Sequence, residues 1–200
     1  MPSTDIPVQA GDLKYKDLNH DGIINDYDKC AIGKHNLSNA TLGWTVRGSW
    51  KGFTLSVLFQ GSFNYSFSIV GTGIEPFKSQ FQPLHEKRWT LERWQNGEDI
   101  EFPRLTSNAN TINSAQGYMS DFWLIDAWYI RLKTVDLSYD FPRKWIPKFM
   151  SGLRLYANCY NLFTWTSYKK YQQDPEIQTN SAGDAYMNQR VVNFGVNISF

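Results

Sequence analysis

Oxygen-bearing side chains recur at short, regular intervals in the stretch KDLNHDGIINDYDKC, residues 16–30. The pattern D-x-N-x-D-G-x-I-N-x-x-D fits most of the ligand positions of an EF-hand calcium loop, with Asp in place of the final Glu. Calcium takes about six to eight oxygen ligands at flexible distances, and a glycine permits the sharp turn among them. The predicted ligands of a structural Ca²⁺ ion are Asp17, Asn19, Asp21, Ile23 through its carbonyl, Asn25 and Asp28.

The segments on either side of this stretch lack the two amphipathic helices of an EF-hand. GDLKYK before it alternates only weakly, and AIGKHNLSNATLG after it is rich in loop-forming residues. The stretch is therefore predicted to be a loop on another scaffold. An acidic turn without an ion is the alternative, and because Asp28 is shorter than Glu we expect an affinity of roughly 10⁻⁵ to 10⁻³ M.

No arrangement of residues typical of catalysis is found. His20, His35 and His85 are isolated, and no motif for a Ser or Cys nucleophile is present, so the protein is predicted not to be an enzyme. Cys30 and Cys159 have no metal-type spacing and are too few for a disulfide framework.

Charge and hydropathy restrict the possible partners and locations. Twenty basic residues are scattered among 19 acidic ones, which gives a net charge of +1 and does not favour nucleic acid as a partner. No apolar run reaches the ~18 residues of a transmembrane helix, and the first residues lack the pattern of a signal peptide. We expect either a cytoplasmic chain or a piece of a longer one.

Alternation of apolar and polar residues with a period of two predicts five strands and no helix. Residues 42–50 and 53–60 alternate on either side of Lys51-Gly52, which predicts a hairpin with Trp50 opposite Phe53. Further strands are predicted over residues 135–141, 153–163 and 190–200; the first follows WYIRLKT, whose alternation has the opposite parity.

The connections between these strands alternate in length. Lys51-Gly52 is short, residues 62–127 are very long, 142–152 moderate and 164–189 long. Strands of about nine to eleven residues can cross a bilayer when tilted, and this asymmetry of loops is typical of outer-membrane barrels. A soluble sandwich with the same alternating faces is the alternative, acting as a calcium-dependent carbohydrate-binding or adhesion module.

Aromatic residues make up 16% of the chain, and many fall near the predicted strand ends. Girdles of such rings are typical of the two membrane–water interfaces. The predicted girdles contain Trp50, Phe53, Tyr139, Phe141 and Phe200 at the periplasmic end, and Phe59, Trp128, Phe163 and Trp165 at the outer end.

Six stretches of this sequence are similar to stretches of a known family and occur in the same order. They are GDLKYKDLNHDGIINDYD, SWKGFTLSVLFQGS, RWT followed by FPRL, SDFWLIDAWYIRLKTVDLSYDFP, LRLYANCYNLFTWTSYKKYQQDPE and the terminal FGVNISF. Together they resemble the C-terminal portion of a TonB-dependent outer-membrane transporter of the SusC/RagA family. The resemblance covers nearly the whole chain from Gly11 onward, with departures at the loop positions Ala10 and Met187.

The resemblance implies an all-β fold: the last five or so strands of an antiparallel transmembrane barrel of about 22 strands. Residues 1–41 would be an extracellular loop and 42–200 the strands with their loops. The plug, the signal peptide and the segment that contacts TonB would lie outside this sequence. The expected location is the outer membrane, with its lipid around the barrel. The expected partner is a SusD-like surface lipoprotein, and the expected cargo an oligosaccharide or, less often, a peptide.

Three further groups of residues gain an expected role. Trp89, Trp94 and Trp123, near Tyr118 in the long external loop, can stack on sugar rings or pack the loop against itself. Asp174-Pro175-Glu176 resembles a structural loop motif of the family. The apolar ladder that ends the chain resembles a barrel-assembly signal, and its members are Phe194, Val196, Ile198 and Phe200.

Overall fold

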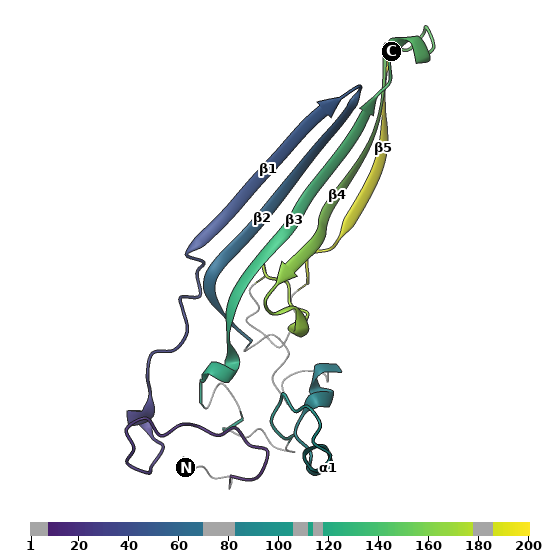
Figure 1. Ribbon diagram of the computed structural model, residues 1–200. Coiled ribbons are helices and arrows are strands. Elements are labelled where there is room, and N and C mark those ends of the chain that lie inside the picture. The colour runs from purple at the N-terminus through teal and green to yellow at the C-terminus, as the bar shows by residue number, and fades with distance from the viewer. Residues whose placement is uncertain (1–7, 70–82, 106–111, 114–117, 178–185) are drawn as a thin grey trace.

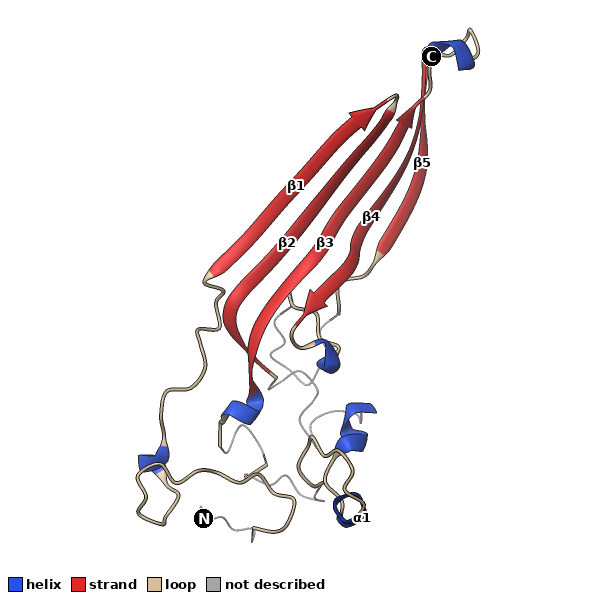
Figure 2. Cartoon of the chain, in the orientation of Figure 1, coloured by secondary structure: helices blue, strands red, loops and turns tan. Residues whose placement is uncertain are grey.

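The computed structural model describes residues 8–69, 83–105, 112–113, 118–177 and 186–200. Five antiparallel strands form one sheet in chain order, without crossovers (Figures 1 and 2). The strands are β1 (Ala40–Trp50), β2 (Phe53–Ser68), β3 (Leu124–Asp140), β4 (Gly152–Thr166) and β5 (Val191–Ser199).

The β1–β2 hairpin has the predicted register, with Trp50 opposite Phe53. Its two connecting residues, Lys51 and Gly52, both have positive φ angles, of 47° and 90°. Such turns match the right-handed twist of the flanking strands. Gly52 is required for a second reason, since an added Cβ would lie 2.7 Å from the carbonyl oxygen of Asp140.

The strands β2 and β3 are longer than predicted, at 16 and 17 residues. The alternation in WYIRLKT changes parity because the pairing of β3 with both of its neighbours shifts register between Leu132 and Thr134. An extra residue at a β-bulge turns the following side chains to the opposite face. One continuous strand therefore replaces the predicted loop and short strand.

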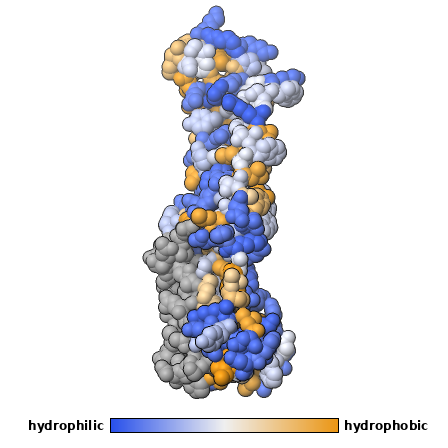
Figure 3. All heavy atoms as spheres, turned by 90° about the vertical axis from the view of Figure 1, so that its left-hand side faces the viewer, coloured by the Kyte–Doolittle hydropathy of each residue, from blue (hydrophilic) through white to orange (hydrophobic). Residues whose placement is uncertain are grey.

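The two faces of the sheet differ in chemistry, as the alternation predicts. Rows of paired residues run across the strands, and in the half of the sheet next to the Lys51-Gly52 turn mostly apolar rows alternate with mostly polar ones. One apolar row contains Val46, Val57, Val135, Cys159 and Val192, and one polar row on the other face contains Arg47, Ser56, Asp136, Asn158 and Asn193. Figure 3, which views the molecule from the β1 side, shows the sheet part of the molecule as a narrow column with both hydrophobic and hydrophilic residues on this side.

The connections gather by length at opposite ends of the sheet (Figure 1). The Lys51-Gly52 turn and the β3–β4 connection, with the short 3₁₀ helix η4 (Arg143–Trp145), lie at the end that carries the C-terminus. The described parts of the longer connections lie at the other end, which we call the loop end. The predicted asymmetry is therefore present.

Helices are few and short in the described part of the chain. The loop end contains the α-helix α1 (Leu91–Gln95) and the 3₁₀ helices η1 (Asp26–Asp28), η2 (Pro83–Lys87), η3 (Asp121–Trp123) and η5 (Lys169–Tyr171). Among the residues that the structure describes, no helix is long and apolar enough to cross a membrane.

Candidate functional site

An aromatic core fastens the long connections to the loop end of the sheet. Tyr65 of β2 and Tyr168, which precedes η5, share a hydrogen bond of 3.1 Å between their hydroxyls. The ring of Tyr168 also stacks on Phe67, with centroids 4.6 Å apart. Trp123 is completely buried in this core and contacts Phe122 edge to face. Burying such rings stabilises the loops by roughly 1.5–3 kcal/mol each, so the core holds the described parts of these connections against the sheet.

A buried ionic network ties the β4–β5 connection to the polar face of β3. The guanidinium of Arg131 donates to Asp174 at 2.8 Å, to Glu176 at 2.7 Å and to the Thr164 hydroxyl at 2.9 Å. Lys133 adds a second cation 2.6 Å from Glu176. The planar fork of arginine suits such multiple carboxylate contacts. This arrangement agrees with a structural role for Asp174-Pro175-Glu176.

A second buried ion pair ties the N-terminal segment to the β2–β3 connection. The carboxylate of Asp12 is 1% exposed and lies 2.6 Å from Nε of Arg104. It also accepts a hydrogen bond of 2.8 Å from the amide of Asn113. Burial by itself raises the pKa of Asp12, but the hydrogen bonds from Arg104, the Gln9 backbone and Asn113 together hold that pKa below its ordinary value.

The three tryptophans predicted to contact sugar have different environments. Trp123 is fully buried, so its ring packs the loop and is not open to a ligand. Trp89 is partly buried, and its ring lies against Gly11, where an added Cβ would be only 2.4 Å away. Trp94, on α1, is 64% exposed. The structure therefore leaves Trp94 as the ring best placed for stacking.

The predicted calcium loop is shaped by its own carboxylates. Asp17 accepts backbone hydrogen bonds from His20 and Gly22, and Asp28 accepts them from Leu18 and Asn25. The bonds from Asn25 and Leu18 lower the pKa of Asp28.

The donors in this loop have the oxygen chemistry that Ca²⁺ prefers. In the described residues, however, no three Asp, Glu, His or Cys side chains converge into a group that could hold a metal ion. Calcium binding therefore stays a prediction.

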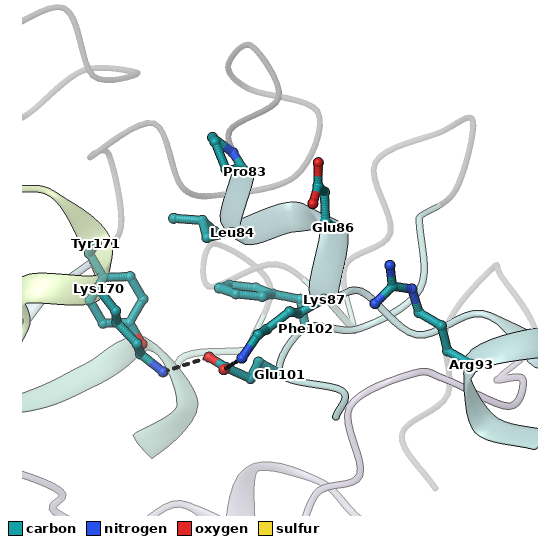
Figure 4. A pocket seen from close by; sticks show the side chains of 9 residues that line it. All are labelled: Pro83, Leu84, Glu86, Lys87, Arg93, Glu101, Phe102, Lys170 and Tyr171. Carbon is teal, nitrogen blue, oxygen red and sulfur yellow. Dashed lines mark hydrogen bonds and ion pairs between the residues drawn. The ribbon is translucent and has the colours of Figure 1, made fainter. Parts of the chain in front are cut away.

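A cavity of about 390 Å³ opens at the loop end, between η2, the segment around Phe102 and η5 (Figure 4). Lys87 and Lys170 both bind Glu101, at 2.5 and 3.0 Å, and Lys87 also binds Asp99 at 2.8 Å. The hydrogen bonds from Lys87 and then Lys170 lower the pKa of Glu101. The full lining is Pro83, Leu84, Glu86, Lys87, Arg93, Glu101, Phe102, Lys170 and Tyr171.

The cavity combines charged and hydrogen-bonding groups with the apolar surfaces of Leu84, Phe102 and Tyr171. Such a mixture can hold a polar ligand that also has an apolar face. No local motif in the sequence marks this site, because its walls come from two connections about 70 residues apart.

Known proteins resemble this chain over nearly its whole length. No protein-family model matches the chain. The chain is 27% identical to the TonB-dependent receptor P39 of Formosa agariphila, over 96% of its own length and 19% of the receptor's. It is 30% identical to the TonB-dependent receptor SusC of Bacteroides thetaiotaomicron, over 93% of its length and 17% of the receptor's.

Solved structures give the same result for the fold. The RagAB peptide importer in its closed-closed state matches 88% of this chain, with a TM-score of 0.63 and 23% identity, over 19% of the importer chain. Another structure, of the RagAB peptide transporter, matches 79% of this chain with a TM-score of 0.57 and 24% identity, over 17% of that chain.

The chain thus has the fold of a TonB-dependent receptor barrel segment. Its antiparallel sheet has one apolar face, one polar face and long loops at one end. Within that class, the 30% identity to SusC and the structural match to RagAB support the SusC/RagA-type resemblance that its sequence motifs predict. It spans about a fifth of the length of the curated relatives it matches. The curated relatives are named as TonB-dependent receptors, and none of these names denotes an enzyme.

Proposed function

We propose that the chain is the lipid-facing wall and part of the external loops of an outer-membrane TonB-dependent transporter. The observation that carries this proposal is the exposed apolar face of the sheet, on which Phe194 and Val196 are 80% and 54% exposed. Lipid would cover such a surface, whereas in water it would favour aggregation. The outer edges of β1 and β5 would pair with further strands, because unpaired backbone groups are costly in a bilayer.

The polar face of the sheet would line the lumen through which cargo passes. Side chains such as Arg47, Asp136 and Asn193 offer hydrogen-bonding groups on this face. The loop end would face the cell exterior and contact a SusD-like lipoprotein. The TonB complex would act on a part of the receptor outside this sequence. The likeness to SusC and to the RagAB structures supports this arrangement.

Oligosaccharides are the cargo we propose, with peptides as the second candidate. The exposed ring of Trp94 and the amphipathic cavity at the loop end suit the alternating apolar faces and hydroxyls of sugars. The structural likeness to the RagAB peptide importer favours peptides instead.

Uptake experiments with the complete receptor separate these candidates. Cells lacking the receptor gene should lose import of labelled oligosaccharides, and the intact gene should restore it. In the Trp94→Ala variant we expect weaker uptake, whereas Leu91→Ala, which alters an exposed residue on the same helix, should leave it unchanged. Loss of peptide import alone would favour the second candidate, and a receptor that is soluble without detergent would contradict both.

We also propose that the loop from Asp17 to Asp28 binds Ca²⁺ in a structural role. Support comes from the spacing of its oxygen donors. In calorimetry on the complete receptor, the double variant Asp17→Ala, Asp21→Ala should lose the calcium signal. The control is Asp26→Ala, which removes an exposed carboxylate bound to Lys29. Identical titrations for the parent and the double variant would refute the site.

A further inference from the structure

Cationic and aromatic side chains gather at the end of the sheet opposite the loop end. The β3–β4 connection contains two Lys-aromatic pairs, four residues apart, and the adjacent hairpin turn adds another lysine. We call this set the basic aromatic cluster, and its members are Lys51, Lys144, Trp145, Lys148 and Phe149.

The β3–β4 connection is folded so that its rings project outward. Ile146 is buried and anchors the connection, while Trp145 and Phe149 are 61% and 66% exposed. The guanidinium of Arg143 donates to the carbonyl oxygen of Met150 and so closes the connection on itself. Two large rings are thus held in the open by a locally ordered segment.

The basic aromatic cluster continues the apolar face of the sheet. The ring of Phe149 stacks on Phe200, with centroids 6.4 Å apart. Phe200 lies two residues beyond Ile198, which is 46% exposed and belongs to the apolar ladder of β5. The cluster therefore lies at the border of the surface that we assign to lipid.

The carboxylates beside this end, those of Asp140 and of the C-terminal Phe200, form no ion pair with a lysine of the cluster in the described residues. The sequence contains no Asp or Glu from 141 to 173, and Asp140, which ends β3, is already bound by Arg154 at 2.5 and 2.8 Å. Within the described part of the chain, the lysines of the cluster form no ion pair with a carboxylate. Two of them lie over rings instead: Lys51 is 4.7 Å from the Trp50 centroid, and Lys144 is 5.8 Å from that of Trp145.

We propose that the basic aromatic cluster binds the headgroups of anionic phospholipids in the leaflet next to the short turns. Aromatic rings partition into the membrane–water interface, and lysines just beyond it attract lipid phosphates. The outward rings, the lysines without a carboxylate partner and the continuity with the apolar face together fit this ligand. The inference rests on the proposed membrane location of the chain.

The test uses the complete receptor in nanodiscs of phosphatidylcholine with a titrated share of phosphatidylglycerol, with bound lipid counted by native mass spectrometry. The variant Lys144→Gln, Lys148→Gln should bind phosphatidylglycerol roughly 10- to 30-fold more weakly. The control Lys16→Gln, Lys169→Gln changes two exposed lysines at the loop end and should bind as the parent does. Raising the salt concentration should weaken binding to the parent.

Retention of phosphatidylglycerol by the Lys144→Gln, Lys148→Gln variant at the parental level would overturn the inference, as would an equal loss in the control. The variant Lys144→Arg, Lys148→Arg keeps the charge and should bind like the parent. Heat-modifiable migration and uptake are recorded for every variant. If the parent migrates and imports cargo normally but binds phosphatidylglycerol no better than phosphatidylcholine, only the lipid-binding role of the cluster is refuted. If the parent does not enter membranes, the proposed function itself is refuted.

Discussion

Replacing Arg131 by methionine should release the β4–β5 connection from the sheet. The guanidinium is almost fully buried, and its carboxylate partners Asp174 and Glu176 are only 6% and 13% exposed. Methionine fills similar space but leaves two buried carboxylates without their shared cation. Glu176 retains Lys133, whereas Asp174 retains only backbone donors, from Glu176 and Asn188.

The expected cost follows from what the partners lose. Removing one partner from a buried ion pair costs about 3–5 kcal/mol, because an uncompensated charge stays behind. The loss should be local, since the strands on either side of Arg131 keep their backbone pairing. At 1.4 kcal/mol per factor of ten, opening of the connection should become at least a hundredfold more frequent.

Limited proteolysis of the complete receptor in detergent measures this opening directly. The Arg131→Met variant should be cleaved within residues 167–190 far faster than the parent. The control is Arg47→Met, which removes an exposed arginine from the same face of the sheet. Adding Asp174→Asn to Arg131→Met should recover much of the protection, since the stranded charge of Asp174 is then gone while Glu176 keeps Lys133. Equal cleavage rates in Arg131→Met and the parent would refute the reasoning.

Three further outcomes are expected. Val57→Arg places a charge on the lipid face and should destabilise the receptor by roughly 2–4 kcal/mol near the midplane. Ser56→Arg, on the polar face, should be tolerated. Equal loss of stability in unfolding experiments on the two variants would contradict the assigned faces. Because the folded-state pKa of Asp12 is lowered, its contribution to stability is full above the ordinary value of 3.8 and is lost as pH falls through the lowered value. Protease protection of the N-terminal segment should decline in that range in the parent, and a parent profile matching that of Asp12→Asn would count against the ion pair. Deleting Phe200 should reduce the heat-modifiable receptor in outer-membrane fractions, and parental levels would argue against the assembly signal.

Features that depend on neighbouring residues could be predicted from the sequence. The period-two alternation of β1, β2 and β5 determined which side chains share a face, because successive residues of a strand point to opposite sides. Lys51-Gly52 determined the hairpin register, since only a tight turn fits between the two alternating runs. The alternation in loop length, and with it the separation of the loop end from the short turns, also followed from the strand positions.

Features that depend on distant residues were decided only by the tertiary structure. The parity change in β3 could not be interpreted until its partner strands showed a bulge. Arg131 pairs with Asp174, 43 residues away, and Lys170 contacts Glu101, 69 residues away. Trp123 is buried because other connections pack against it. Local pattern does not encode such contacts, because their free energy arises only when folding brings the two segments together and removes water from between them.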